Sequence, residues 1–294
     1  MYNFEGMIAA MPTPFNKDES IDYYGVKVLI EFFIEAGLHG VLVGGSTGEF
    51  FFLSQEERKE LFKCCCEASA GRIPIIAHTG CPRTADTISL SKYADEVGAS
   101  ANLVLTPHFM AVNSSMIYDY YSDIAKNTKN GLIIYHFPGA SGTRLSPQQV
   151  VELSKIDGLI GIKNTEDMDH TVSILILTRD NPDFHIATGY DSLAFNTLNM
   201  GGNASMGVIH NILPRQMVAM YDAIRANKIE EARELNNRLL PITTIIEGEP
   251  YPGPLKACLG LLGLPGGVPR KPIPVTSAAL TEQLKCYLQD LNVL

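Results

Sequence analysis

The chain has 294 residues, of which 46% are hydrophobic and 19% charged, a balance typical of a globular protein. Its formal net charge is −9 and it contains no basic run, so we expect no nucleic-acid partner. No apolar run reaches the roughly 18 residues of a membrane span, and the first residues lack a signal-peptide pattern. We therefore expect a cytoplasmic protein with no membrane partner.

Eight short apolar runs predict β-strands. In chain order they cover residues 7–11, 40–43, 73–78, 102–105, 132–135, 159–163, 184–187 and 204–206. Amphipathic segments with helical periodicity follow them at 23–36, 54–70, 84–97, 115–126, from 146 onward, 168–179 and 193–200. Ser54 and Glu57 form a capping-box pattern at the start of the second helix.

Strict alternation of strands and helices implies parallel strands joined by right-handed crossovers. Eight such units predict an α/β fold of the (β/α)₈ (TIM) barrel type, which we place at residues 1–224. Helical patterns at 214–226, 229–246, 254–262 and 277–291 predict a C-terminal helical extension, residues 225–294. An open doubly wound sheet is the alternative, but no phosphate-binding glycine pattern follows the first strand.

The strand at 159–163 ends on Lys163, and the preceding strand ends on Tyr135. A lysine that cannot reach bulk water has a lowered pKa, and its neutral amine can attack a carbonyl to form a Schiff base. A neighbouring phenol could move protons during that reaction. The alternatives are a lysine that marks where a strand surfaces and a rim tyrosine whose hydroxyl is in water.

The loop after the second strand packs glycines around two hydroxyl residues, Gly45-Ser46-Thr47. Such a loop exposes backbone N–H groups, which suits an anion. It has neither the P-loop ending nor the dinucleotide spacing, so we expect it to bind a carboxylate. An ordinary tight turn is the alternative.

Metal or cofactor chemistry is not expected. No two of the seven histidines have metal-ligand spacing on one element. The adjacent cysteines Cys64, Cys65 and Cys66 would point in different directions from a helix, which makes a poor metal site. We expect the six cysteines to be reduced thiols.

Several motifs in order make the chain resemble the N-acetylneuraminate lyase and dihydrodipicolinate synthase family. They are the Gly44-Gly45-Ser46-Thr47-Gly48-Glu49 loop, Tyr135-x-x-Pro138 with Ser141-Gly142, Gly161-Ile162-Lys163 followed by Thr165, Gly189-Tyr190-Asp191, Pro254-x-Lys256 and Pro269-Arg270-x-Pro272. The resemblance implies a class I aldolase barrel that needs no metal and is usually a homotetramer, a dimer of dimers. It implies that Lys163 forms a Schiff base with pyruvate, that Tyr135 relays protons, and that Ser46 and Thr47 hold the keto-acid carboxylate.

Four positions depart from the family patterns. The arginine that grips a semialdehyde carboxylate in the synthases is replaced by Ala140, which cannot form a bidentate clamp. Two polar residues that read the substrate tail in the sialate lyases look like Ser192 and Val208 here. The second relay tyrosine, which the family offers across a subunit interface, corresponds to Phe109.

The resemblance and these four departures together lead us to expect a lyase that reversibly cleaves a 2-keto-3-deoxy sugar acid into pyruvate and an aldehyde. Lys163, Tyr135 and Thr47 are the predicted catalytic residues. The predicted substrate-binding residues are Gly45, Ser46, Thr165, Gly189, Asp191, Ser192 and Met206. The alternatives are N-acetylneuraminate lyase, dihydrodipicolinate synthase (4-hydroxy-tetrahydrodipicolinate synthase), and a non-catalytic relative that only binds keto acids.

Overall fold

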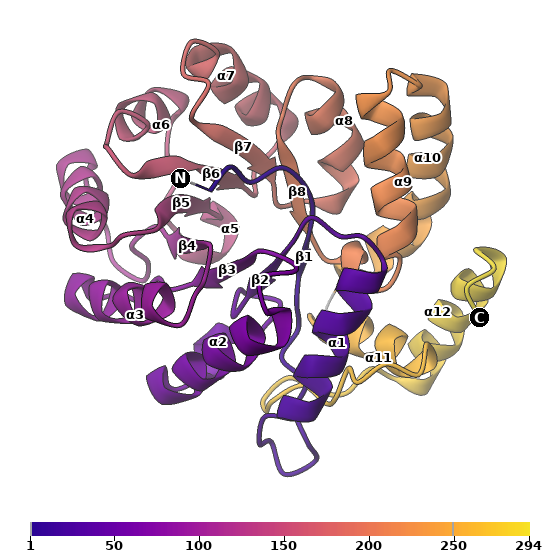
Figure 1. Cartoon of the computed structure of the whole chain (residues 1–294). Coiled ribbons are helices and arrows are strands. Elements are labelled where there is room, and N and C mark those ends of the chain that lie inside the picture. Colours follow the sequence, from indigo (N-terminus) through magenta and orange to yellow (C-terminus); the bar gives the residue numbers. More distant parts are fainter. Residues whose placement is uncertain (1, 249) are drawn as a thin grey trace.

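Eight parallel strands close into a barrel in the computed structural model, which describes residues 2–248 and 250–294 (Figure 1). The strands follow sequence order around the barrel, and β1 closes it by pairing with β8. They are β1 (Gly6–Ala10), β2 (Gly40–Val43), β3 (Ile75–His78), β4 (Ala101–Leu105), β5 (Gly131–His136), β6 (Leu159–Asn164), β7 (His185–Thr188) and β8 (Ala204–Gly207). The predicted TIM barrel is confirmed, and closure rules out the open doubly wound sheet.

Helices surround the barrel and continue beyond it on one side (Figure 1). They are α1 (Tyr23–Glu35), α2 (Gln55–Ser69), α3 (Thr84–Glu96), α4 (Ser114–Asn127), α5 (Pro138–Ser141), α6 (Pro147–Leu153), α7 (Met168–Thr178), α8 (Ala194–Asn199), α9 (Pro214–Arg225), α10 (Ile229–Ile246), α11 (Gly253–Leu261) and α12 (Ala278–Asp290). Three short 3₁₀ helices are η1 (Phe50–Phe52), η2 (Asp191–Leu193) and η3 (Ile209–Asn211). Across residues 2–248 and 250–294, no helix combines the length and apolar character that crossing a bilayer requires.

The sequence signals and the elements agree to within about two residues at their ends. The Ser54–Glu57 capping box is present at the start of α2, and Ser146 with Gln149 forms a second one at α6. The sequence did not predict α5 or the 3₁₀ turns, because single turns are too short to show a helical period.

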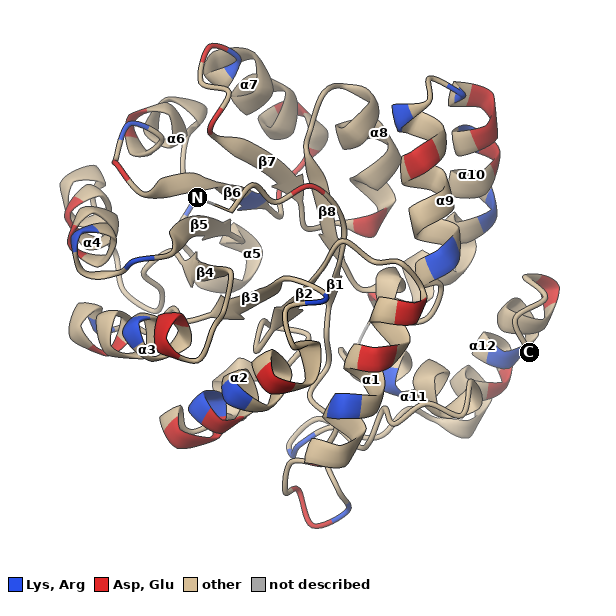
Figure 2. Cartoon of the chain, in the orientation of Figure 1, with Lys and Arg blue, Asp and Glu red and all other residues tan. Residues whose placement is uncertain are grey.

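The strands are buried on both faces, as parallel strands covered by helices must be. One apolar layer fills the barrel and others lie between the barrel and its helices. Figure 2 shows that charged residues lie mainly on the helices and loops, while the strands are almost wholly uncharged. A buried charge on a strand is therefore unusual in this molecule.

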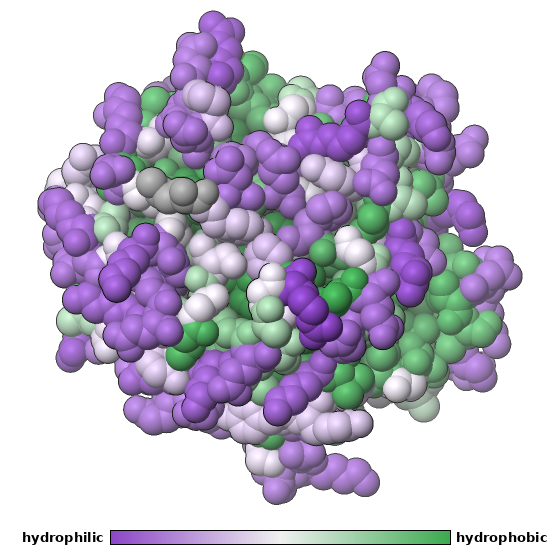
Figure 3. Space-filling model, in the orientation of Figure 1, coloured by the Kyte–Doolittle hydropathy of each residue, from purple (hydrophilic) through white to green (hydrophobic). Residues whose placement is uncertain are grey.

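The C-terminal extension packs on the side of the barrel where α1 and α9 lie (Figure 1). On the face shown in Figure 3 the surface is mostly hydrophilic, and apolar side chains gather on the side of α11 and α12. The boundary between barrel and extension at residue 224 stays a prediction, since α9 and α10 pack directly against each other.

A buried ion pair joins the extension to the barrel. Lys256 Nζ lies 2.6 Å from Glu49 Oε1, and both side chains are almost fully buried. The same ammonium donates to the carbonyl oxygens of Thr13 at 2.9 Å and Val268 at 2.8 Å. The other Glu49 oxygen, Oε2, accepts from the backbone N–H of Arg270 at 2.9 Å.

Replacing Lys256 with methionine should therefore lower the free energy of unfolding by about 3 kcal/mol, because Glu49 would be left as a buried, uncompensated charge. Lys285→Met is the matched control, since Lys285 lies 3.7 Å from Glu282 in an exposed pair that contributes at most about 1 kcal/mol. Urea unfolding of the three proteins measures both effects. Equal stability of the two variants would contradict the structural role of Lys256.

Candidate active site

Lys163 occupies the carboxyl end of β6, where barrel enzymes place their catalytic side chains. The residue is only 4% exposed. Burial lowers the pKa of its amine to about 8, although the nearby Asp191 carboxylate partly opposes that shift. A far larger share of this amine is neutral near pH 7 than in an ordinary lysine, so it is suited to nucleophilic attack.

Tyr135 is the direct neighbour of Lys163 across the β5–β6 pair. The Lys163 Nζ lies 4.5 Å from the centre of the Tyr135 ring. The phenol is 2.9 Å from Ser46 Oγ, and burial raises the pKa of Tyr135 to about 12. The phenol is therefore protonated near neutral pH and can donate a proton at the position where the amine reacts.

The space around Lys163 depends on a glycine at the end of β7. A Cβ at Gly189 would lie 2.0 Å from Thr165 Oγ1 and 3.0 Å from Lys163 Cε. Any larger residue there would displace the lysine or the threonine. The Thr165 hydroxyl is buried and makes no hydrogen bond to the described residues, which leaves it available to a ligand.

The loop predicted to bind a carboxylate is held in place by the segment that follows β1. Thr13 Oγ1 donates to the Gly48 carbonyl oxygen at 2.7 Å. A Cβ at Gly48 would lie 3.1 Å from Gly44 Cα, so the loop folds tightly back on itself. This arrangement presents the Ser46 and Thr47 hydroxyls beside Lys163.

A cavity of about 420 Å³ brings these groups together. Most of the predicted site residues line it: Ser46, Thr47, Tyr135, Lys163, Thr165, Gly189 and Met206. The remaining lining residues are Ala10, Phe51, Phe137, Gly139, Ala140, Tyr190, Val208, Glu247 and Tyr251. Among these described residues Lys163 is the one cation.

A second chamber of about 410 Å³ adjoins the first and shares five lining residues with it: Ser46, Phe51, Tyr135, Phe137 and Ala140. It contains Arg58, which is 4% exposed. The Arg58 guanidinium donates to the Gly80 carbonyl oxygen at 3.2 Å and also to the His78 carbonyl oxygen. Arg58 therefore belongs to the chamber wall.

Three predicted substrate-binding residues do not line the cavity. Asp191 is buried, and its Oδ2 accepts from the backbone N–H groups of Val208 at 2.7 Å and Ile209 at 3.0 Å. Its carboxylate thus fixes the turn after β8. Ser192 is exposed, and Gly45 is buried beside the cavity without facing it.

The departures from the family patterns have clear positions. Ala140 lies between the two chambers, so no arginine reaches the cavity from that site. The Phe109 side chain is fully exposed, and its backbone is left-handed with φ 70°. Phe109 lines neither chamber of this chain.

Two lining residues from the C-terminal extension were not predicted, Glu247 and Tyr251. Glu247 Oε1 accepts from the backbone N–H of Asp191 at 3.0 Å. Burial and the neighbouring Asp191 raise the pKa of the Glu247 carboxyl to about 8. The only sequence signal is an aromatic residue in a proline- and glycine-containing break between two helical stretches, and that signal is weak.

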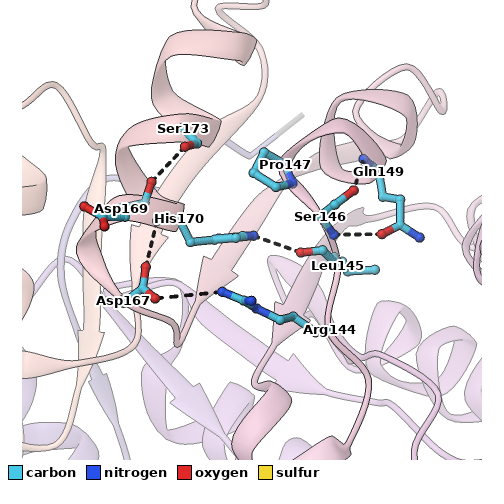
Figure 4. A pocket seen from close by; sticks show the side chains of 9 residues that line it. All are labelled: Arg144, Leu145, Ser146, Pro147, Gln149, Asp167, Asp169, His170 and Ser173. Carbon is cyan, nitrogen blue, oxygen red and sulfur yellow. Dashed lines mark hydrogen bonds and ion pairs between the residues drawn. The ribbon is translucent and has the colours of Figure 1, made fainter.

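A separate groove of about 510 Å³ lies on the outside of the barrel, between α7 and the segment that leads into α6 (Figure 4). His170 Nε2 donates to the Leu145 carbonyl oxygen at 2.9 Å, and Arg144 lies 3.8 Å from Asp167. These polar groups pair with one another across the groove. Among the described residues, no cluster of three or more His, Cys, Asp or Glu side chains could hold a metal ion.

A buried lysine with a lowered pKa at the mouth of a (β/α)₈ barrel is typical of one class of enzyme, the one that forms Schiff bases with carbonyl substrates. The profile of the dihydrodipicolinate synthetase family matches residues 3–291, and the chain belongs to that family. It is a pyruvate-dependent carbon–carbon lyase that forms its Schiff base on a lysine.

Individual relatives agree with this assignment. The 4-hydroxy-tetrahydrodipicolinate synthase of Archaeoglobus fulgidus is 33% identical over 291 residues, which cover 99% of each chain. YagE, a prophage protein of the dihydrodipicolinic acid synthase family from E. coli K12 solved in complex with pyruvate, is 30% identical with a TM-score of 0.95, covering 99% of each chain.

The oligomeric state is not fixed by the relatives. A monomeric dihydrodipicolinate synthase variant is 29% identical, with a TM-score of 0.95, and the match covers 99% of this chain and 98% of the variant. The expected homotetramer stays a prediction.

Proposed function

We propose that this chain joins pyruvate to an aldehyde, and reversibly cleaves the product, through a Schiff base on Lys163. One observation carries the proposal: a buried amine with a pKa near 8 faces a phenol inside a hydroxyl-lined cavity. A non-catalytic keto-acid binder would need neither the lowered pKa nor the adjacent proton donor.

The chemistry uses the Lys163 amine, the Tyr135 phenol and water. The Lys163 amine attacks C2 of pyruvate, and the resulting carbinolamine loses water to give an imine. Transfer of a C3 proton to water gives an enamine, whose C3 bonds to the aldehyde carbon while Tyr135 donates a proton to the aldehyde oxygen; the proton taken from C3 then restores the phenol. Water then hydrolyses the imine, releases the product and restores the amine.

The name shared by the relatives makes 4-hydroxy-tetrahydrodipicolinate synthesis the first candidate for the particular reaction. It supports that reaction better than the cleavage of a 2-keto-3-deoxy sugar acid, which the sequence motifs had suggested. Removing the carbons of pyruvate from the product leaves aspartate semialdehyde as the second substrate.

One observation keeps the sugar-acid reaction as the second candidate. Lys163 is the one cation among the described lining residues, and Ala140 stands where a carboxylate clamp is expected. Glu247 adds a carboxyl group to the same wall. An uncharged, hydroxylated aldehyde would meet hydrogen-bonding partners there, whereas a second substrate carboxylate would meet no arginine within this cavity. Arg58 lies in the adjoining chamber, where its guanidinium already donates to two carbonyl oxygens.

Initial rates with pyruvate and either aspartate semialdehyde or glyceraldehyde separate the two candidates. The synthase proposal expects kcat/KM to be at least roughly tenfold higher with the semialdehyde, because a matched polar group is worth that much or more in discrimination. The reverse order would select the sugar-acid reaction. Pyruvate binding without turnover on either aldehyde, or on a wider aldehyde panel, would indicate a non-catalytic relative.

A further inference from the structure

Two consecutive hydroxyl residues in the β2 loop are each bonded to a different tyrosine. Ser46 Oγ lies 2.9 Å from the Tyr135 hydroxyl, and Thr47 Oγ1 lies 2.5 Å from the Tyr251 hydroxyl. Both pairs line the cavity that contains Lys163. The first tyrosine comes from the barrel, but the second comes from the C-terminal extension, 204 residues after its partner.

Thr47 is buried and Tyr251 is partly buried, and the pair stays neutral. Thr47 is 2% exposed. Burial raises the pKa of the Tyr251 phenol well above its usual range, so the phenol keeps its proton at any working pH. The two hydroxyls carry two hydrogens, and their mutual bond uses one of them. The other remains available to an oxygen atom in the cavity.

Tyr251 is itself held firmly on the barrel. Four residues before it, Glu247 accepts from the backbone N–H of Asp191 at 3.0 Å. Five residues after it, Lys256 forms the buried ion pair with Glu49. Because both flanks are attached to the barrel, the phenol has a defined position relative to Thr47.

We propose that Tyr251 is a positioning residue of the keto-acid site, whose phenol holds the Thr47 hydroxyl in the orientation that binds the substrate carboxylate. The proposal rests on the Schiff-base function proposed above and on the carboxylate position at Ser46 and Thr47 that the family resemblance implies. The proposal gives the two tyrosines different roles: Tyr135 transfers protons during carbon–carbon bond formation, and Tyr251 supports binding of the keto acid before the reaction. The C-terminal extension then contributes to the active site within a single chain.

A double-mutant cycle of Tyr251→Phe and Thr47→Val tests this role. The dissociation constant of pyruvate, from calorimetry and from the concentration dependence of borohydride trapping, should rise about three- to tenfold in Tyr251→Phe, as expected for one lost hydrogen bond. The maximal trapping rate should stay near the wild-type value, because Lys163 is untouched. In the Thr47→Val background, Tyr251→Phe should not raise the dissociation constant of pyruvate any further. In the Thr47→Ser background, which keeps a hydroxyl at this position, Tyr251→Phe should raise it as it does in the wild type.

Tyr121→Phe is the matched control, since it removes a buried phenol that donates to the Val104 carbonyl oxygen at 2.9 Å outside the cavity. It should match the fall in Tm of Tyr251→Phe without changing pyruvate affinity. Additive effects in the cycle, or an unchanged affinity in Tyr251→Phe, would overturn the role of Tyr251.

The cycle also separates this inference from the function on which it rests. Wild-type protein that binds pyruvate but is not trapped would refute the Schiff base alone, and calorimetry would still measure the coupling. Wild-type protein that does not bind pyruvate at all would refute both.

Discussion

Replacing Lys163 with alanine should abolish the covalent pyruvate adduct and lower kcat by roughly 10⁴-fold or more, the loss expected when an enzyme's nucleophile is removed. Lys163→Arg should be equally inactive, because a guanidinium keeps the charge but offers no neutral amine. Borohydride reduction in the presence of pyruvate, followed by peptide mass spectrometry, measures the adduct, and steady-state rates measure turnover.

The chain contains its own comparison for this experiment. Lys256 is also buried, and burial lowers its pKa to about 8, as it does for Lys163. Its ammonium, however, is bonded to Glu49 and to two carbonyl oxygens and does not line the cavity. We therefore expect the reduced adduct on Lys163 and none on Lys256. An adduct on both would show that burial alone selects the reactive lysine.

The trapping rate should also depend on pH in a definite direction. With a pKa of about 8, roughly one Lys163 amine in ten is neutral at pH 7, against about one in 3,000 for an ordinary lysine. Because the neutral form is the nucleophile, the rate should rise as pH increases through 8 and then level off. A rate still rising tenfold per pH unit at pH 9 would contradict the lowered pKa.

The sequence predicted the fold well because the two signals on which a barrel depends are local. A buried strand shows as a short apolar run, and its covering helix shows as a 3.6-residue period with a cap such as Ser54. Eight consecutive strand–helix units are then compatible with few chain topologies. Single turns such as α5 have no period to detect, and they were missed.

The site was predictable where barrel topology determines it. Lys163 and Tyr135 end adjacent strands, so their proximity follows from strand order. Asp191 also follows a strand end, yet its carboxylate turns away to bond two backbone N–H groups after β8. Nothing local in the sequence distinguishes these two outcomes.

Tyr251 illustrates a different limit. Its partner Thr47 is 204 residues earlier, and the pairing depends on how the extension folds back over the barrel. Neither periodicity nor motif spacing encodes that return. A cavity wall built from segments so far apart in the chain is therefore visible only in the three-dimensional structure.

Tyr135→Phe should lower kcat for carbon–carbon bond formation by roughly a thousandfold, within the range that a positioned acid–base group contributes. Burial raises the pKa of Tyr135 to about 12, so the phenol starts as a proton donor. In the cleavage direction it must act as a base, and the positively charged imine nitrogen on Lys163 would stabilise the phenolate that this requires.

The measurement is kcat in both directions, together with the pyruvate affinity. Tyr135→Phe should reduce kcat in both directions and change pyruvate affinity little, whereas Tyr251→Phe should weaken pyruvate binding and leave the maximal trapping rate near wild type. A Tyr135→Phe enzyme within threefold of the wild-type kcat would refute its acid–base role. The proton transfer would then be reassigned to Tyr251, because it is the other phenol bonded to a loop hydroxyl in the cavity. That result would also refute the proposal that Tyr135 serves the chemistry and Tyr251 serves only binding.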